Sequence, residues 1–537
     1  MKKFKLFAAS LGLMTLAACS NTDDVFNGAE ELAQAQAEDN AIQFGTYFGQ
    51  SAQTRAGTAG AITTASLKTG NHKNDGFGVF AYYTGANDWQ TGTSYAETPT
   101  GVTGQTALKP NFMYNQQVKW TDKGESGHIG SEGNYAWAYT PLKYWPNDIQ
   151  NGAVDDQTTD GAATGDGSNG GKLSFFAYAP YVADASGDYG ITNMTANSVA
   201  SDPILTYAVA AKGNEVVDLL WGTTGTNGVN VLGNANSGVT HNSSGTNYQK
   251  SILPNKNTSP DGYTLNADLT KQKTDGQVNF AFKHALAKVG GSNVTTSPAS
   301  VNGLMIKLDL DDDKGAETGG TKEDATKVTV KSINIVARAK SAASGDEKYY
   351  QTKQTGTFNL ATGRWSITSS QGTDASAATT TYLINQDGTS DDAAGQLAAA
   401  ILEPTVAPAK TSAGFDGLPA GVTTTAQNVY ATEAAPLVYI PGTYPELTVT
   451  VDYIVRSKDS NLADAYSEVE QIITKKLTFG EAVKLNKQYN LLIHLGLTGI
   501  KFTATVSDWD TDIDEDGIIG VDDEGDRKDI NIPINVQ

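Results

Sequence analysis

Four aspartates near the end of the chain have the spacing of a calcium-binding loop. In "DIDEDGIIGVDD" they fall at loop positions 1, 3, 5 and 12, and they are Asp512, Asp514, Asp516 and Asp523. Carboxylates at alternate positions can converge on one cation, and the glycine at position 6 permits the sharp turn such a loop needs. Position 12 is aspartate, where a longer bidentate glutamate is usual. The pattern predicts either a calcium site or an acidic surface loop that binds no ion.

Cys19, the one cysteine in the chain, follows an export signal. Lysines precede the apolar run "LFAASLGLMTLAA", which is too short to cross a membrane as a mature helix. The run ends in "LAAC", and small residues before a cysteine suit a lipoprotein signal peptidase. We expect residues 1–18 to be a lipoprotein signal peptide, and the Cys19 thiol to carry the lipid with its palmitate-type acyl chains. The alternative is an ordinary signal peptide with a chance cysteine.

Arg55 lies in a stretch whose residues are unable to form a packed core. Its neighbours in "QSAQTRAGTAG", residues 50–60, are small, polar or glycine. Exposed loops of this composition are where proteolysis concentrates, so we expect an arginine-cutting protease to act between Arg55 and Ala56. Residues 19–55 would then be a propeptide. The alternative is a solvated loop arginine with no such role.

Residues that could perform catalysis are absent or scattered. The five histidines show no H-E-x-x-H spacing and no pairing typical of a metal site, and no G-x-S-x-G motif is present. We therefore expect no enzyme and no cofactor other than the calcium considered above. Asp and Glu outnumber Lys and Arg by 59 to 38, a formal charge of −21, which argues against nucleic acid as a partner.

The sequence predicts that the elements carrying these residues are mostly β-strands. Apolar and polar residues alternate in short runs bounded by Gly, Pro, Asn or Asp. Strands are expected at 41–48, 76–83, 143–146, 172–181, 204–210, 216–221, 278–289, 304–310, 327–337, 357–360 and 363–367, and in most of the C-terminal 100 residues or so. One helix is expected at 391–402, where two aspartates open the segment and a proline follows it. "SEVEQIITKK" is read as a strand because its β-branched residues outweigh a helical pattern.

This distribution predicts an all-β fold with few short helices. We expect two β-sandwich domains, at residues 56–285 and 286–528, because the strand runs are short, numerous and separated by turn signals. The chain is long enough for such domains to rely on buried cores without disulfides.

Two segments near the ends share one pattern. Ile42, Phe44, Thr46 and Phe48 alternate in "AIQFGTYF", and Ile530, Ile532, Ile534 and Val536 alternate in the last nine residues, 529–537. We expect residues 41–48 to fill a groove in their own N-terminal domain. We expect the terminal strand to lack a partner in its own sheet and to be donated to another chain. The alternative is an ordinary C-terminal strand that pairs within its own domain.

Several motifs, taken in order, resemble those of the fimbrillins, the β-rich subunits of type V pili of Gram-negative bacteria. They are the lipobox at Cys19, "IQF", "TRA", "YWP", "LSFFAYAPY", "VNFAFKHALAKV", "GTFNLATGRW" and "QYNLLIHLGLTGIKFTATVSDWD". The resemblance implies transthyretin-like sandwich domains and export as an outer-membrane lipoprotein. It also implies removal of the propeptide after Arg55, and polymerisation with identical subunits into the shaft of a cell-surface fimbria. Tip and anchor subunits and an arginine-specific protease are the implied partners.

Two other functions stay open at this stage. A monomeric surface lipoprotein could bind a glycan or a host ligand through aromatic residues such as Trp89, Trp137 and Trp145. A tip or anchor subunit of a fimbria is the other possibility; an anchor would keep its lipid and its propeptide.

An arginine-only protease should cut the native chain at Arg55 far faster than at the other arginines. Arg338 and Arg456 lie in or beside expected strands, where a protease needs local unfolding first. N-terminal sequencing after brief digestion should give a chain that begins at Ala56. Survival of the 19–55 segment under conditions that nick other loops would contradict this expectation.

Overall fold

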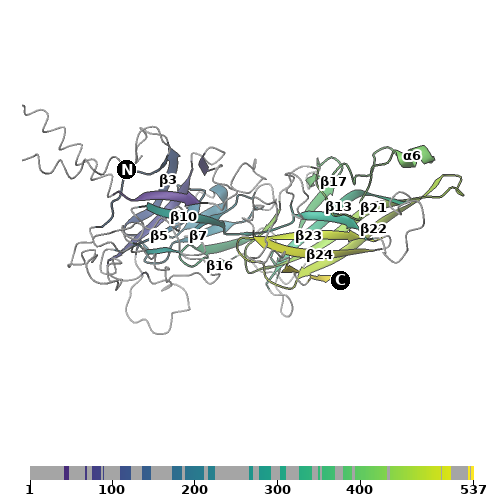
Figure 1. Cartoon of the computed structure of the whole chain (residues 1–537). Helices are drawn as coiled ribbons and strands as arrows, with labels where there is room; N and C mark the ends of the chain where they lie inside the picture. The colour runs from purple at the N-terminus through teal and green to yellow at the C-terminus, as the bar shows by residue number, and fades with distance from the viewer. Residues whose placement is uncertain are drawn as a thin grey trace, which may run out of the picture.

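The protein is described here from a computed structural model. The structure describes residues 41–47, 67–68, 75–85, 89, 109–121, 136–146, 172–183, 188–210, 216–223, 265–269, 277–291, 303–309, 326–341, 349–350, 354–368, 379–389, 393–431, 436–496, 499–508, 530–531 and 534–536. The elements formed by these residues are strands, apart from the short α-helix α6 (Ser412–Asp416), the 3₁₀ turn η1 (Asp188–Gly190) and two helical residues at 67–68. The expected all-β fold class is confirmed. Figure 1 shows the N-terminal strands gathered in one half of the molecule and most C-terminal strands in the other.

The sheet of the N-terminal half closes on itself. Its strands follow one another as β2 (Phe77–Gly85), β3 (Met113–Thr121), β4 (Ala136–Ala138), β1 (Gln43–Tyr47), β10 (Gln277–His284), β8 (Leu220–Thr223) and β5 (Lys172–Ala179), with β9 (Asn266–Leu269) beside β5. Because β5 also pairs with β2, the first seven strands form a ring. Alternate residues of β5 enter different cores: Phe175 faces the interior of the ring, and Phe176 faces outward. β5 is therefore buried along its whole length.

A second sheet covers the outside of this ring and mixes distant parts of the chain. Its order is β16 (Arg364–Ile367), β15 (Thr355–Asn359), β7 (Ile204–Ala208) and β6 (Ile191–Met194). The β15–β16 hairpin turns at Gly363, whose φ is +70° and where an added Cβ would lie 2.3 Å from the Trp221 ring. Trp221 also donates from Nε1 to the Leu360 carbonyl at 2.9 Å. This hairpin, from after residue 286, thus packs on the N-terminal half. The domain limits at 285 and 286 stay a prediction.

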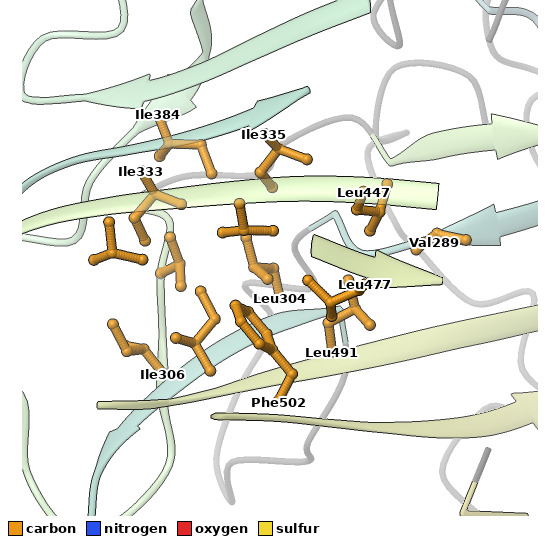
Figure 2. Packing of buried hydrophobic residues seen from close by; sticks show 14 of the residues in the cluster. Val289, Leu304, Ile306, Ile333, Ile335, Ile384, Leu447, Leu477, Leu491 and Phe502 are labelled. Atoms are coloured by element: carbon orange, nitrogen blue, oxygen red, sulfur yellow. The ribbon is translucent and has the colours of Figure 1, made fainter. Parts of the chain in front are cut away.

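The C-terminal half is a sandwich of two sheets. One contains β19 (Gln427–Asn428), β12 (Leu304–Leu308), β23 (Lys487–Leu495), β11 (Ala287–Val289) and β20 (Leu437–Tyr439), with β24 (Ile500–Asp508) on β23 and β25 (Ile530–Asn531) on β24. The other contains β18 (Ala393–Gln396), β17 (Thr380–Asn385), β13 (Thr326–Lys340), β21 (Tyr444–Lys458), β22 (Tyr466–Phe479) and β26 (Ile534–Val536), with β14 (Tyr349–Tyr350) on β13. In Figure 2, Ile306, Leu491 and Phe502 of the first sheet meet Ile333, Ile335 and Leu447 of the second. Burial of these alternate residues defines the core.

The prediction of a helix at 391–402 is wrong. Residues 393–396 form strand β18, which pairs in parallel with β17, and a turn follows at 399–401. Gly395 disfavours a helix at this point, and the ladder with β17 supplies the backbone partners that a helix would have made internally. The strand expected within "SEVEQIITKK" is confirmed, because the whole segment lies in β22.

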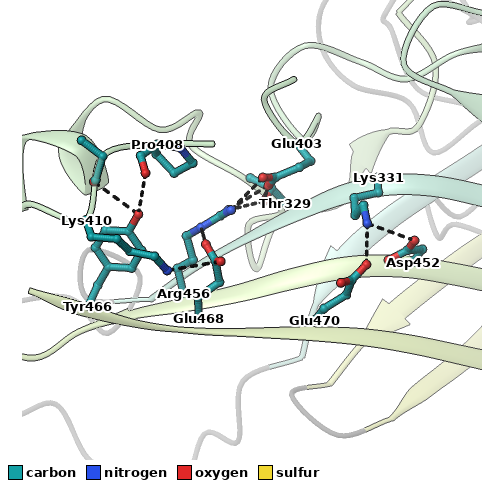
Figure 3. Close-up of polar contacts among 11 residues, drawn as sticks. Thr329, Lys331, Glu403, Pro408, Lys410, Asp452, Arg456, Tyr466, Glu468 and Glu470 are labelled. Carbon is teal, nitrogen blue, oxygen red and sulfur yellow. Dashed lines mark hydrogen bonds and ion pairs between the residues drawn. The ribbon is translucent and has the colours of Figure 1, made fainter. Parts of the chain in front are cut away.

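A polar cluster joins β21 to the loop before α6 at the far end of the sandwich (Figures 1 and 3). The Arg456 guanidinium is 2% exposed and donates to both oxygens of Glu403, at 2.7 and 2.8 Å. Its Nε donates to Glu468 at 2.6 Å, and Lys410 contacts the other oxygen of Glu468 at 3.2 Å. Burial alone would raise the pKa of Glu468, but Arg456 and Lys410 outweigh it and lower that pKa.

Arg456→Met should lower the free energy of unfolding by about 3–5 kcal/mol, because it leaves the Glu403 carboxylate nearly buried without its cation. Lys331→Met is the matched control. Lys331 pairs with Asp452 and Glu470 but is 40% exposed, so its loss should cost less than about 1 kcal/mol. Urea unfolding of the two variants measures the difference. Equal losses would contradict a structural role for the Arg456 cluster.

Candidate assembly site

The N-terminal strand β1 lies between β4 and β10, which are not paired with each other, and so closes the ring. It runs parallel to β10, from Gln43 opposite Gln277 to Tyr47 opposite Ala281. Against β4 it has one paired position, Phe44 opposite Trp137. Upstream, the Ile42 amide donates to the Lys143 carbonyl at 2.9 Å. Residues 41–47 thus lie between β4 and β10, and this position is the seat of β1. That the seat is a groove from which the strand can leave stays a prediction.

Phe44 anchors β1 in an aromatic pocket. Its ring is stacked on Phe280 at 5.9 Å and meets Tyr139, Phe175 and Phe77 edge-on at 5.2, 6.0 and 6.3 Å between centroids. The side chain is 4% exposed, and Ile42, two residues earlier on the same face, is fully buried. Aromatic pairs of this geometry contribute beyond their buried area. Among the described side chains of residues 41–46, Phe44 is the largest apolar group that would leave the ring core with β1.

A buried phenol holds the start of β1. Tyr139 is 3% exposed, and its hydroxyl donates to the Ile42 carbonyl at 2.9 Å. Burial raises the pKa of Tyr139 above its usual range, although a hydrogen bond with the Lys143 backbone opposes the rise. The phenol therefore remains a donor at any ordinary pH. At the other side of the strand, the side-chain amide of Gln277 donates from Nε2 to the Phe44 carbonyl at 3.4 Å.

The segment after the expected cut contacts the same part of the ring. Leu67 is fully buried in the ring core, and the Lys68 ammonium lies 4.0 Å from the Trp120 ring and 5.9 Å from the Trp137 ring. Burial lowers the pKa of Lys68. Because these residues follow Ala56, a cut after Arg55 would leave them in the body of the chain, where Leu67 belongs to the same core cluster as Phe44.

The C-terminal strand has partners in its own chain, so the expectation of an unpaired strand is wrong. β25 pairs with β24 at Ile530 and Asn531, and β26 pairs with β22 at residues 534–536. The segment passes from the edge of one sheet of the sandwich to the edge of the other. The described residues of this segment make five paired positions. Two- and three-residue strands at sheet edges are held by few backbone hydrogen bonds.

The three tryptophans considered for ligand binding are not exposed. Trp89, Trp137 and Trp145 are each 5–6% exposed and belong to the cores of the N-terminal half. Each of the three rings packs against a neighbouring aromatic ring. None of them is therefore available at the surface to contact a ligand.

Several predicted site residues lie outside the described residues: Cys19, Arg55, Ala56, Phe48, Ile532 and the aspartates Asp512, Asp514, Asp516 and Asp523. Within the described ranges, no group of three or more His, Cys, Asp or Glu side chains could hold a metal ion. The same part of the chain contains no helix long and apolar enough to cross a membrane. The pocket residues Phe77, Tyr139, Phe175 and Phe280 did not emerge from the sequence as site residues. The alternating aromatics of "LSFFAYAPY" and "VNFAFKH" were the available signal.

Comparison with known proteins points to fimbriae. Fimbrium subunit Fim1C of Phocaeicola vulgatus is 25% identical over 266 residues, which make up 49% of this chain and 46% of that protein. The match thus spans about half the length of this curated relative. A crystal structure of a fimbrial protein from Bacteroides vulgatus ATCC 8482 covers 88% of this chain and 99% of its own, with a TM-score of 0.46 and 16% identity. No family model matches. The resemblance to fimbrial subunits seen in the sequence motifs is confirmed by the first of these similarities.

Phe44→Ala should loosen β1 in the uncut protein by about 3–5 kcal/mol, since it empties the aromatic pocket. Hydrogen exchange at the β10 amides of residues 277–281 should therefore speed up. Gln43→Ala is the control: Gln43 is on the same strand but exposed, and its loss should change stability by less than about 0.5 kcal/mol. Unchanged protection of β10 in the Phe44 variant would show that Phe44 does not hold the strand.

Proposed function

We propose that this chain is a structural subunit of a cell-surface fimbria and that it polymerises by exchange of one strand. The observation that carries the proposal is the position of β1. It completes the ring of the N-terminal half through non-covalent contacts, yet its link to the rest of the chain runs through the segment where we expect the cut after Arg55. The similarity to a fimbrium subunit supports the fimbrial role.

Cleavage would convert an internal strand into a separate fragment. Before the cut, β1 is tethered and returns to its seat whenever it detaches. After the cut, detachment becomes a dissociation into bulk solvent, which the tether no longer opposes. The empty seat exposes the unpaired edge of β10, the short strand β4 and the aromatic pocket of Phe44. An unpaired edge beside an apolar pocket is a template for another strand.

The incoming strand is residues 530–536 of a neighbouring subunit. Its aliphatic residues recur at every second position, as the seat requires, and their burial would contribute about 6–12 kcal/mol before association costs. To be donated, the segment must first leave β22 and β24, where it has only five paired positions. Pro533 cannot donate to a ladder, so in the donated strand its nitrogen must face away from the partner strand.

The remaining assignments complete this scheme. The precursor is a lipoprotein of the outer membrane with lipid on Cys19, and removal of residues 19–55 by an arginine-specific protease frees the subunit from its anchor. The partners are identical subunits and the tip and anchor subunits of the same fimbria. The chain has a structural role in adhesion and no enzymatic one. The four aspartates of the 512–523 loop remain a predicted calcium site.

A monomeric, glycan-binding lipoprotein is the weaker alternative. Its argument rested on Trp89, Trp137 and Trp145, and all three are buried. A tip subunit needs no C-terminal strand to donate outward, whereas this chain has one with the alternation of a donor.

A chain that lacks residues 529–537 should fold and be cut at Arg55 but form no fibres and no heat-resistant ladders on a gel. Negative-stain microscopy of the cut protein provides the second measurement. Polymerisation equal to that of the full chain would rule out strand donation from the C-terminus.

Two point variants test whether the aliphatic face of the donor strand is required, without deletion of the segment. Ile534→Asp places a charge on the aliphatic face of the strand and should block assembly. Asn535→Asp, one residue along on the opposite face, should assemble as the unchanged protein does, since neighbouring strand residues point to opposite faces.

A further inference from the structure

One residue of β1, Thr46, is poorly matched to the apolar position that it occupies between β4 and β10. The role proposed below for this residue rests on the strand exchange proposed above. Thr46 follows Ile42 and Phe44 at the period of two, so it shares their core-facing side of the strand. Its backbone partner on β10 is Phe280, which is fully buried and stacks on the Phe44 ring. A polar side chain therefore follows the side chains of Ile42 and Phe44 along this face of the strand.

The Thr46 hydroxyl is buried without a partner. Among the residues that the structure describes, its Oγ1 atom has no hydrogen-bond partner. In the unfolded or detached strand the same hydroxyl is hydrated. Seating β1 thus removes a hydrogen bond to water and replaces it with none, which weakens the occupied state.

The C-terminal strand has no such residue on its apolar face. Ile530, Ile532, Ile534 and Val536 carry no polar side-chain atom. Whichever three consecutive members of this row replace Ile42, Phe44 and Thr46, an aliphatic side chain takes the place of the threonine. The difference between the two occupants at this position is one buried, unpaired hydroxyl.

We propose that Thr46 is a specificity-determining residue of the exchange: it makes β1 the weaker occupant of its own seat, so that the strand from another copy of this chain displaces it after the cut. The tether through residues 48–55 keeps β1 seated before cleavage despite this weakness. Cleavage then releases a strand that is already the poorer fit.

The same sheet supplies a matched control. Thr121, at the end of β3, also has a buried Oγ1 without a hydrogen-bond partner among the described residues. β3 stays in place throughout the exchange. Valine at either position removes an unpaired hydroxyl with little change of shape, so both variants should be stabilised, but only one alters the departing strand.

The experiment compares the unchanged chain with Thr46→Val, Thr46→Ser and Thr121→Val. Each full-length protein is cut at Arg55 by an arginine-only protease. Ladder formation is followed on a gel, and the fragment that ends at Arg55 is followed by size-exclusion chromatography. The thermal midpoint of each uncut protein is measured in parallel.

Thr46→Val should slow both release of the fragment and ladder growth by at least about five-fold, because its β1 no longer carries the cost of the unpaired hydroxyl. Thr46→Ser keeps the hydroxyl and should exchange at least as fast as the unchanged chain. Thr121→Val should raise the thermal midpoint and leave the exchange rate unchanged.

Two results would overturn the role of Thr46. One is a Thr46→Val chain that releases its fragment at the unchanged rate, and the other is an equal slowing by Thr121→Val, which would mean that general stability governs exchange. Failure of the proposed function looks different, because the unchanged chain would then form no ladders after the cut.

Discussion

The N-terminal half depends on the closure of one sheet. A ring of strands has no free edge, so every strand in it serves as the partner of two others, and loss of one opens two edges at once. β1 is the member of the ring joined to β4 at a single position and to β10 over five. It also supplies Phe44 to the aromatic core of Phe77, Tyr139, Phe175 and Phe280. The strand that completes the domain is therefore the one nearest the expected cleavage site, and only another strand of similar pattern can restore the closure.

The C-terminal sandwich has the opposite property. Its core lies between the long central strands β13, β21 and β23, and its last two short strands sit at sheet edges. Removal of β25 and β26 exposes edges but leaves the core of Ile333, Leu447 and Leu491 in place. In the proposed assembly, the N-terminal half therefore needs a strand and the C-terminal half donates one. This asymmetry suits head-to-tail assembly, in which each subunit is both acceptor and donor.

The alternation in "AIQFGTYF" was sufficient to predict a half-buried strand, and the apolar runs between turn residues near the C-terminus were sufficient to predict further strands, because such patterns are local properties of the chain. Pairing partners are not local. Nothing in the sequence sets Gln43 against Gln277, places the β15–β16 hairpin on the N-terminal half, or surrounds Trp137 with other rings. The helix expected at 391–402 failed for the same reason, since a ladder with β17 took precedence over local propensity. The aromatic pocket and the unpaired Thr46 hydroxyl depend on such contacts and emerge only from the fold.

The central claim is that β1 vacates its seat and that a second chain refills it. Mass analysis of purified, denatured fibres tests this claim most directly, because it identifies every polypeptide that the assembled fibre retains. The account predicts chains that begin at Ala56 and no fragment that ends at Arg55. Fibres that hold this fragment in equal amount with the subunit would contradict it, since β1 would then still occupy the place assigned to the incoming strand.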